Sequence, residues 1–286
     1  MERKGGRVNA PARRRGCKAR TTGASNRNTC KPTSMSSRFD LTGASIRSTR
    51  SARCSASGPT AKATVAKARN KKPRALDLFC CAGGAGMGLH RAGFEVVGVD
   101  IVPQPRYPFE FHQADALTYP LAGFDFIWAS PPCQVHSITA SLHRHRVRKH
   151  RDLIMPVRER LAASGLPYVI ENVMGAPLLN PIMLCGTMFG LRVYRHRLFE
   201  TSFFLLAPPH GKHTHGSTGS HRGYSRDNPM VCVAGHNFKK EEGEEAMGID
   251  WMTNRAQLAQ AIPPAYSEFL GRAALDHLST FGEAAE

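Results

Sequence analysis

The sequence predicts an α/β protein with a doubly wound, mostly parallel sheet, and two observations lead to this fold class. Short apolar runs that end in turn residues alternate with helical patterns along residues 74–172. A glycine-rich turn, CCAGGAGMG, follows the first of these runs and opens a helix, as in Rossmann-like nucleotide-binding folds. Strands that alternate with helices are typical of parallel pairing with helices on both faces.

The expected elements follow in chain order. The predicted strands are residues 74–79 (RALDLF), 95–100 (EVVGVD), 124–129 (FDFIWA) and 167–172 (PYVIEN). The glycine-rich turn opens a helix at GLHRAG, residues 88–93. Residues 152–165 predict a second helix that ends at Gly165 and whose apolar side chains share one face, namely Leu153, Ile154, Val157 and Leu161.

The net positive charge of the chain is confined to its N-terminal part. Residues 1–74 carry 20 Lys and Arg residues against two acidic residues, whereas residues 75–286 carry 19 basic and 20 acidic residues. Residues 1–73 are also rich in Arg, Ser, Thr and Gly, which predicts a disordered basic tail. Three interpretations stay open: an arm that binds nucleic acid, an organelle transit peptide, or an upstream stretch included by a wrong start codon.

The rest of the chain, residues 74–286, is expected to form one domain in a reducing cytoplasm. No run of 18 apolar residues occurs, so we expect no membrane span. The eight cysteines include no two C-x-x-C pairs of zinc-site spacing. The histidines of residues 210–221, HGKHTHGSTGSH, are interleaved with glycine and serine, which favours a mobile loop over a metal site. We therefore expect no metal.

A cysteine follows two prolines directly after the predicted strand of residues 124–129, in the stretch ASPPCQVHS. Loops at the carboxyl ends of strands carry the ligand-binding groups of open α/β sheets. Cys133 is therefore either a small buried hydrophobic residue or a nucleophile on a loop that Pro131 and Pro132 stiffen. Only the neighbouring motifs can decide between the two interpretations.

The glycine-rich turn and two acidic residues outline a cofactor site. Gly83 and Gly84 let the backbone approach a ligand at the helix N-terminus. Asp100 ends the second strand, 23 residues after Asp77, where it can accept hydrogen bonds from ribose hydroxyls. Asp115 follows an expected third strand and either accepts from an adenine amino group or only caps a helix. Dehydrogenases, flavoproteins and methyltransferases all use such a turn.

Together and in this order, the segments resemble the motifs of the bacterial and phage DNA (cytosine-5)-methyltransferases, from about Ala75 to Gly271. The similar segments are DLFCCAGGAGMGLHRAGF, VGVDI and ADAL for the cofactor motifs, PPCQVHS for the catalytic loop, and ENV, YRHRLF and AIPPAYSEFLG for the sixth, eighth and tenth motifs. The resemblance implies an S-adenosyl-L-methionine-dependent, Rossmann-like fold. It also implies that the residues that bind this cofactor are Phe79, Gly83, Gly84, Asp100, Ile101, Asp115 and Pro132.

The resemblance further implies four catalytic residues. Cys133 is the nucleophile that attacks C6 of a flipped-out cytosine, and Glu171 shares a proton with N3 of the base. Arg195 and Arg197 are spaced so that both point the same way on a strand, toward the base, its phosphate or the catalytic loop. The basic run of residues 142–152 is expected to contact phosphates.

Two features depart from the pattern of the family. Cys81 stands where the family usually has glycine, which puts the affinity for the cofactor in doubt. Only about 65 residues separate Arg197 from the tenth motif, so the target-recognition region, about residues 200–245, is reduced and is expected to hold short strands and loops.

The sequence thus predicts a DNA (cytosine-5-)-methyltransferase that acts as a monomer on double-stranded DNA, without a membrane or a metal, in the cytoplasm of a bacterial or phage-infected cell. Two alternatives stay open. A related branch of enzymes uses the PPCQ and ENV pair on tRNA, and a relative that binds DNA without catalysis is the third hypothesis.

Overall fold

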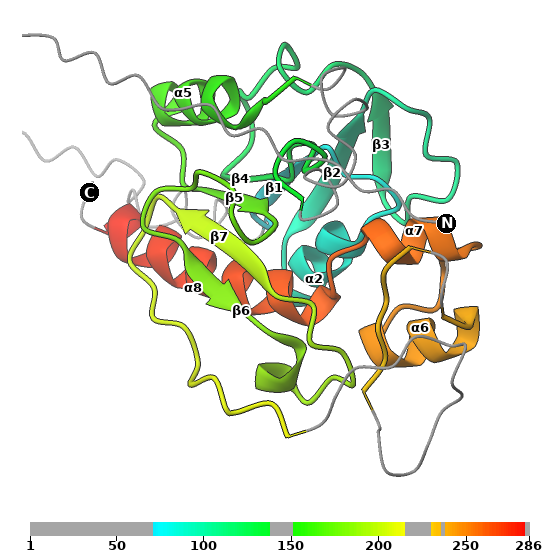
Figure 1. Cartoon of the computed structure of the whole chain (residues 1–286). Coiled ribbons are helices and arrows are strands. Elements are labelled where there is room, and N and C mark those ends of the chain that lie inside the picture. Colours follow the sequence, from blue (N-terminus) through cyan, green and yellow to red (C-terminus); the bar gives the residue numbers. More distant parts are fainter. Residues whose placement is uncertain (1–70, 138–150, 215–229, 236–237, 284–286) are drawn as a thin grey trace, which may run out of the picture. The chain divides into compact units, whose positions relative to one another are not determined.

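The computed structural model describes residues 71–137, 151–214, 230–235 and 238–283. Its centre is a seven-stranded sheet of order β3-β2-β1-β4-β5-β7-β6 (Figure 1). The first five strands pair in parallel, and β7 runs antiparallel to both β5 and β6. The strands are Arg74–Leu78 (β1), Glu95–Asp100 (β2), Glu110–Gln113 (β3), Phe126–Ala129 (β4), Tyr168–Asn172 (β5), Ile182–Leu184 (β6) and Arg197–Thr201 (β7).

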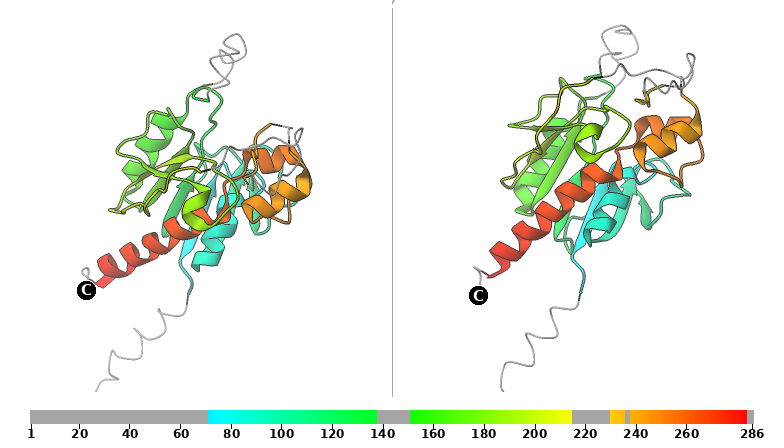
Figure 2. Two further views of the ribbon diagram at one scale, coloured as in Figure 1. Left: turned by 60° about the horizontal axis from the view of Figure 1, so that its bottom comes forward. Right: turned by 90° about the horizontal axis from the view of Figure 1, so that it is seen from below.

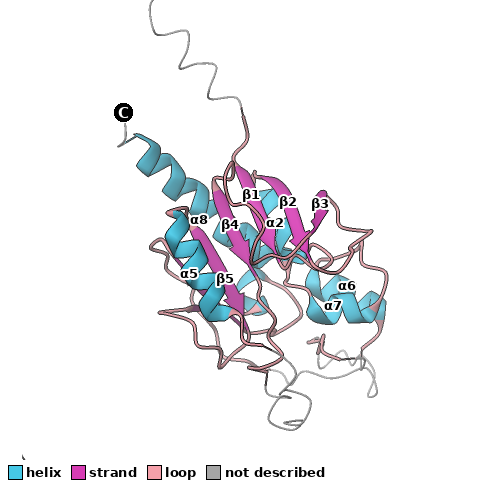
Figure 3. Ribbon diagram, turned by 90° about the horizontal axis from the view of Figure 1, so that it is seen from above, coloured by secondary structure: helices cyan, strands magenta, loops and turns pink. Residues whose placement is uncertain are grey.

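Helices cover both faces of the sheet, which confirms the predicted fold class. On one face α2 (Gly84–Ala92) packs along α8 (Pro264–Glu283) (Figure 2). On the other face lies α5 (Ile154–Ser164) (Figure 3). The predicted helix of residues 152–165 is thereby confirmed, since Ile154, Val157 and Leu161 are buried and Gly165 ends α5 in the left-handed conformation, with φ 70°.

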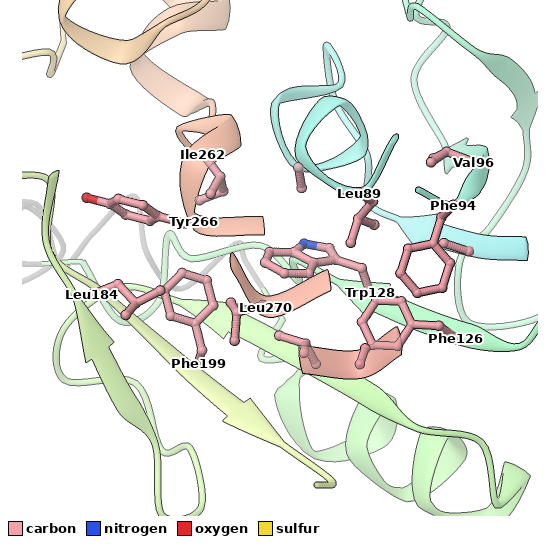
Figure 4. Packing of buried hydrophobic residues seen from close by; sticks show 14 of the residues in the cluster. Leu89, Phe94, Val96, Phe126, Trp128, Leu184, Phe199, Ile262, Tyr266 and Leu270 are labelled. Carbon is pink, nitrogen blue, oxygen red and sulfur yellow. The ribbon is translucent and has the colours of Figure 1, made fainter. Parts of the chain in front are cut away.

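The core on the α2 and α8 face is built around aromatic side chains. Trp128 of β4 is fully buried and packs between the two helices and the sheet, near Leu89 of α2 and Leu270 of α8 (Figure 4). Phe94 and Phe126 stack at 5.3 Å between ring centroids. Each fully buried side chain of this size contributes about 2 kcal/mol through the apolar area that it removes from water. This packing fixes the sheet against α2, whose N-terminus faces the candidate site.

The order of the strands creates a crevice at one edge of the sheet. From β1 the chain proceeds to β2 on one side, and it later returns to β4 on the other side of β1. Leu78 and Ala129 are partners in the β1–β4 register, so the turn that starts at Phe79 and the loop that starts at Ser130 leave adjacent positions in different directions. In open α/β sheets, ligands bind where the chain diverges in this way.

Residues 240–247 form a helix that the sequence patterns did not predict. This helix, α6 (Lys240–Met247), has Glu241 and Glu242 in its first turn, where acidic side chains stabilise the positive end of the helix dipole. It packs against α7 (Arg255–Gln260). A Cβ atom at Gly243 would lie 2.5 Å from the Phe238 ring, so glycine permits the close packing here. Local charge and packing outweigh the low helix propensity of glycine.

Several sequence predictions lie outside the described residues. These are the basic tail up to residue 70, the basic run of residues 142–150 and the histidines beyond residue 214. Among the described helices, none has both the length and the apolar character that a membrane span requires.

Candidate active site

A cavity of about 360 Å³ lies where the carboxyl ends of β1 and β4 diverge. Its volume falls within the range of small-molecule sites. Four segments line it: the turn of residues 79–85, the end of β2, the loop of residues 130–134 and residues 259–262. Glu171 of β5 and Arg197 of β7 complete the wall. The lining includes these residues predicted from the sequence: Phe79, Gly84, Asp100, Ile101, Pro132, Cys133, Glu171 and Arg197.

Cys133 lies half-buried on a loop that is attached to β5 and folded into a local turn. The side-chain amide of Asn172, a fully buried residue of β5, donates a hydrogen bond of 2.9 Å to the Pro131 carbonyl. The backbone N–H groups of His136 and Ser137 donate to the Cys133 carbonyl at 3.0 Å. The loop therefore holds the thiol in one place against the cavity.

The pKa of the Cys133 thiol is raised, first by burial and then by the negative charge of Glu171. The positive charge of Arg197 opposes this shift. At rest the group is therefore a thiol, while the neighbouring guanidinium stabilises the thiolate once it forms.

Glu171 and Arg197 form a buried ion pair beside the thiol. The Nε atom of Arg197 lies 3.2 Å from Oε1 of Glu171, whose side chain is 8% exposed. Burial raises the pKa of Glu171, and Arg197 together with a hydrogen bond from Ser130 counteracts that shift. A carboxyl group with a raised pKa keeps its proton to a higher pH than usual and can deliver it to a bound base.

Arg195 lies close enough to Cys133 and Glu171 for its charge to lower the pKa of both groups, but its hydrogen bonds differ from those of Arg197. Arg195 precedes β7 and has φ 26°, so the alternation of a strand does not apply to it. Its guanidinium donates to the backbone carbonyls of Val233 at 2.8 Å and Ala259 at 2.7 Å. Burial lowers the pKa of Arg195 to about 9. Arg195 is not among the described residues that line the cavity, and its contacts tie three segments together beside it.

Asp100 holds the glycine-rich turn in place. Its Oδ2 accepts a hydrogen bond of 3.0 Å from the Cys81 N–H, and its Oδ1 accepts one of 2.9 Å from the Val102 N–H. Each carboxylate oxygen can accept a further hydrogen bond, so these contacts leave room for the predicted ribose hydroxyls. Cys81 has φ 44° and Phe79 has φ 59°, in the left-handed region that favours glycine.

Gly83 and Gly84 are glycines for different reasons, because Gly83 has a positive φ and Gly84 lies close to another segment. Gly83 precedes α2 with φ 84°, and it is not among the described residues that line the cavity. A Cβ atom at Gly84 would lie 2.5 Å from the Ile262 carbonyl oxygen. Gly84 thus allows the start of α2 to approach the segment before α8, which closes the cavity on that side.

Asp115 is not among the described residues that line the cavity, and its place beside an adenine stays a prediction. Its side chain is exposed, and its Oδ1 accepts a hydrogen bond of 2.8 Å from the Leu117 N–H. The strand before it, β3, already ends at Gln113, so Asp115 belongs to the next turn. The hydrogen bond from Leu117 closes a local turn rather than a helix, and the other carboxylate oxygen can still accept a hydrogen bond from a ligand.

Asp77 is a cavity residue that the sequence analysis did not select. It is fully buried in β1, and its Oδ2 accepts a hydrogen bond of 2.9 Å from the Tyr107 hydroxyl. Its Oδ1 has no hydrogen-bond partner among the residues that the structure describes. Burial raises the pKa of Asp77 from 3.8 to about 7. The sequence does hold a sign of this residue, namely an acidic side chain inside the apolar strand RALDLF. Burial of a carboxyl group costs free energy, so an acidic residue in such a strand indicates a functional role.

Comparisons with known proteins give a likeness of fold at low identity. No protein-family model and no curated protein matches the sequence. The structure is similar to the Entamoeba histolytica methyltransferase EhMeth, with a TM-score of 0.48 and 13% identity over 73% of this chain and 99% of that chain. For the S. pombe Dnmt2 methyltransferase the TM-score is 0.47 and the identity 15%, over 73% and 99%. For Spodoptera frugiperda DNMT2 the values are 0.47 and 12%, over 71% and 99%.

Proposed function

We propose that this chain is an S-adenosyl-L-methionine-dependent methyltransferase that modifies C5 of cytosine in DNA. One observation carries the proposal: a single cavity holds the Cys133 thiol, the Glu171–Arg197 ion pair and the turn that Asp100 organises. The order of the sequence motifs supports it independently. The simplest form of the proposal is a monomer that acts on double-stranded DNA in the cytoplasm.

The groups at the β1 and β2 end of the cavity fit the proposed cofactor. Asp100 would accept hydrogen bonds from the ribose hydroxyls, and Ile101, whose side chain is 69% exposed, would cover the adenine. The unpaired Oδ1 of Asp77 would accept a hydrogen bond from the ammonium group of the methionine part. When bound, the cofactor supplies an electrophilic methyl group.

The residues at the β4 and β5 end fit an attack on cytosine. C5 of cytosine is a poor nucleophile until the ring gains electron density. The Cys133 thiolate would form a bond to C6, while Glu171 delivers a proton to N3 and neutralises the charge that develops on the ring. C5 would then bond to the methyl carbon as the bond between that carbon and the cofactor sulfur breaks. A general base would remove the C5 proton, and the electrons of the C5–H bond would re-form the C5–C6 double bond and expel the cysteine as a thiolate. N3 would return its proton to Glu171 in the same step.

The reaction requires a cytosine that is no longer stacked inside the duplex. A cavity lined by a buried carboxyl group cannot be reached by a cytosine inside a duplex, so the base would have to be flipped out, at a cost of a few kcal/mol. Contacts with the nucleic-acid backbone would have to offset this cost. The preference for DNA over tRNA rests on the motif resemblance.

The experiment that tests the proposal measures transfer of a radiolabelled methyl group from S-adenosyl-L-methionine. The full-length protein is incubated in parallel with duplex DNA, with single-stranded DNA and with tRNA. We expect label in 5-methylcytosine of duplex DNA, loss of transfer in Cys133→Ser, and normal transfer in Cys232→Ser, whose thiol lies outside the cavity lining. Label on tRNA alone would support the tRNA enzyme. Binding of DNA without binding of the cofactor and without transfer would support the non-catalytic relative.

A further inference from the structure

A second group of chemically reactive side chains lies outside the cavity. Cys185, His196, His210 and His213 each present one ligand atom, and these four atoms all lie within 4.8 Å of one another. The Cys185 Sγ atom is 3.4 Å from Nε2 of His213, which is 3.1 Å from Nε2 of His210. We call these four residues the Cys-His cluster.

The Cys-His cluster is assembled from three separate parts of the chain. Cys185 is fully buried between β6 and the short 3₁₀ helix η1 (Gly186–Phe189). His196 lies directly before β7, and the other two histidines lie on residues 204–214, which belong to no helix or strand. The Tyr194 ring stacks on His213 at 3.7 Å between centroids, which orients that imidazole toward the thiol.

We infer that the Cys-His cluster is a binding site for one Zn²⁺ ion. Zinc prefers four tetrahedral nitrogen and sulfur ligands, with bonds of about 2.0–2.1 Å to nitrogen and about 2.3 Å to sulfur. In such a tetrahedron neighbouring ligand atoms lie about 3.3–3.6 Å apart. The separations around His213, 3.1 and 3.4 Å, are close to these values, so small side-chain rotations would complete the site.

Hydrogen bonding alone accounts for the cluster less well than a cation does. Nε2 of His213 faces both the Cys185 sulfur and Nε2 of His210. A neutral imidazole nitrogen carries either one proton or one lone pair, so it can serve only one of these neighbours well. A zinc ion placed between them would use the lone pairs of all four groups at once, and the thiol proton would pass to solvent.

The ligand set also indicates the metal and its role. A thiolate with three imidazoles in a tetrahedron suits zinc among the common divalent ions. Four protein ligands leave no open position for water or a substrate, which is typical of structural rather than catalytic zinc. The Thr187 hydroxyl lies 3.2 Å from the Cys185 sulfur, where it can donate to the thiolate and orient it.

The site would connect a segment without regular structure to the wall of the cavity. Zinc would fasten residues 204–214 to the start of η1 and to His196. His196 precedes Arg197, whose guanidinium pairs with Glu171. The metal would thus hold the start of β7 beside the cavity. This inference replaces the sequence-based expectation of no metal, and it does not depend on the proposed reaction.

The test measures metal content directly in tag-free, full-length protein. After gel filtration without chelator we expect about one zinc ion per chain, as for a closed structural site. Cys185→Ser and His213→Ala should lower the zinc content at least tenfold. The matched controls Cys232→Ser and His90→Ala, which change residues outside the cluster, should keep it.

Cobalt(II) provides a second readout that does not depend on catalysis. Protein reloaded with cobalt(II) alone should show the intense visible bands of a tetrahedral ion and a thiolate-to-metal charge-transfer band, and Cys185→Ser should lose the latter. If Cys185→Ser fails to fold, the exposed ligand His210 serves instead, and His210→Ala should weaken metal binding at least tenfold. Wild-type protein that binds neither zinc nor cobalt(II) at micromolar concentration would overturn the inference, as would a His210→Ala variant with unchanged affinity.

Discussion

The Nε atom of Arg197 lies 3.2 Å from Oε1 of Glu171, in the same cavity wall as the Cys133 thiol. Burial and the guanidinium act on this carboxyl group in opposite directions, and burial is the larger influence on its pKa. A bound base that takes the proton of Glu171 would leave a carboxylate that Arg197 already neutralises.

Replacement of Glu171 by glutamine should slow methyl transfer and change its pH dependence. Glutamine keeps the shape of the side chain but cannot deliver a proton, so we expect a loss of roughly 100-fold or more in kcat with little change in affinity for DNA. The raised pKa of Glu171 keeps the acid protonated to a higher pH than usual, and activity should fall once the pH exceeds it. The rate of Glu171→Gln should lack this alkaline fall. Single-turnover rates across a pH series measure both effects.

Glu200 is the matched control because it is a buried carboxylate paired with arginine outside the cavity. Its two oxygens accept from Nε and a terminal nitrogen of Arg158 at 2.8 and 2.7 Å. Glu200→Gln should cost about 3–5 kcal/mol of stability, since it breaks a buried pair, and leave the shape of the pH profile unchanged. A Glu171→Gln variant that lost only DNA binding would contradict the assigned role.

DNA that contains 5-fluorocytosine should trap the enzyme covalently. Fluorine at C5 cannot leave as a proton, so the cysteine cannot be eliminated after methyl transfer. We expect a complex that survives denaturation, with the label on the peptide that contains Cys133. Mass spectrometry locates the bond. A complex of equal yield in Cys133→Ser would show that another group is the nucleophile.

Replacement of Asp77 by asparagine should change how stability depends on pH. The folded protein raises the pKa of Asp77 from 3.8 to about 7, so it binds this proton more tightly than the unfolded chain does. Stability from this group is therefore full below pH 3.8 and falls as the pH rises to about 7. Relative to wild type, Asp77→Asn should gain up to about 4 kcal/mol between pH 4 and 8. Urea unfolding at several pH values measures this difference.

Tyr107→Phe should have the opposite effect, because it removes the hydroxyl that donates to Asp77. The pKa of Asp77 should then rise further, so the fall of stability should continue to higher pH than in wild type. Asp77→Asn should also weaken binding of S-adenosyl-L-methionine at least about tenfold, measured by calorimetry, since a charged hydrogen bond is lost. Unchanged affinity would show that the unpaired oxygen does not contact the cofactor.

Glycine at position 81 should stabilise the protein and strengthen cofactor binding. Cys81 has φ 44°, a conformation that costs a residue with a side chain about 1–2 kcal/mol. Glycine has more conformational entropy in the unfolded chain, and this offsets part of the gain. We therefore expect a net stabilisation of roughly 0.5–1 kcal/mol in Cys81→Gly. Cys80 is buried and is not among the described residues with positive φ, so Cys80→Gly should destabilise instead. Thermal unfolding with and without S-adenosyl-L-methionine compares the two variants.

Removal of residues 1–70, which lie outside the described residues, should weaken DNA binding without a change in chemistry. This segment carries most of the net positive charge of the chain. A protein that begins at Lys71 should keep its turnover rate and target sequence, and its log affinity should depend less steeply on log salt because fewer phosphates are neutralised. Affinities of both proteins across a salt series decide the point. Equal slopes would favour the transit-peptide or wrong-start interpretation.

The sequence by itself determined the elements that depend on local patterns. Apolar runs located β1, β2, β4 and β5, and helical periodicity with Gly165 located α5. Each pattern records the preferences of one continuous segment, so no knowledge of distant residues was needed. The ordered motifs also led to Cys133 and Glu171, which the structure places in one cavity because both follow or end neighbouring parallel strands.

Only the tertiary structure decided how distant segments meet. The antiparallel pairing of β6 and β7 has no signal in either strand alone, and the direction of Arg195 depends on carbonyl groups 38 and 64 residues away. Its burial in the structure identified Asp77 as a candidate site residue. The Cys-His cluster was identified by the contact between Cys185 and His213, which is 28 residues further along the chain. These contacts depend on the packing of the whole sheet and its helices, and packing is a property of all the segments together that no single stretch of sequence encodes.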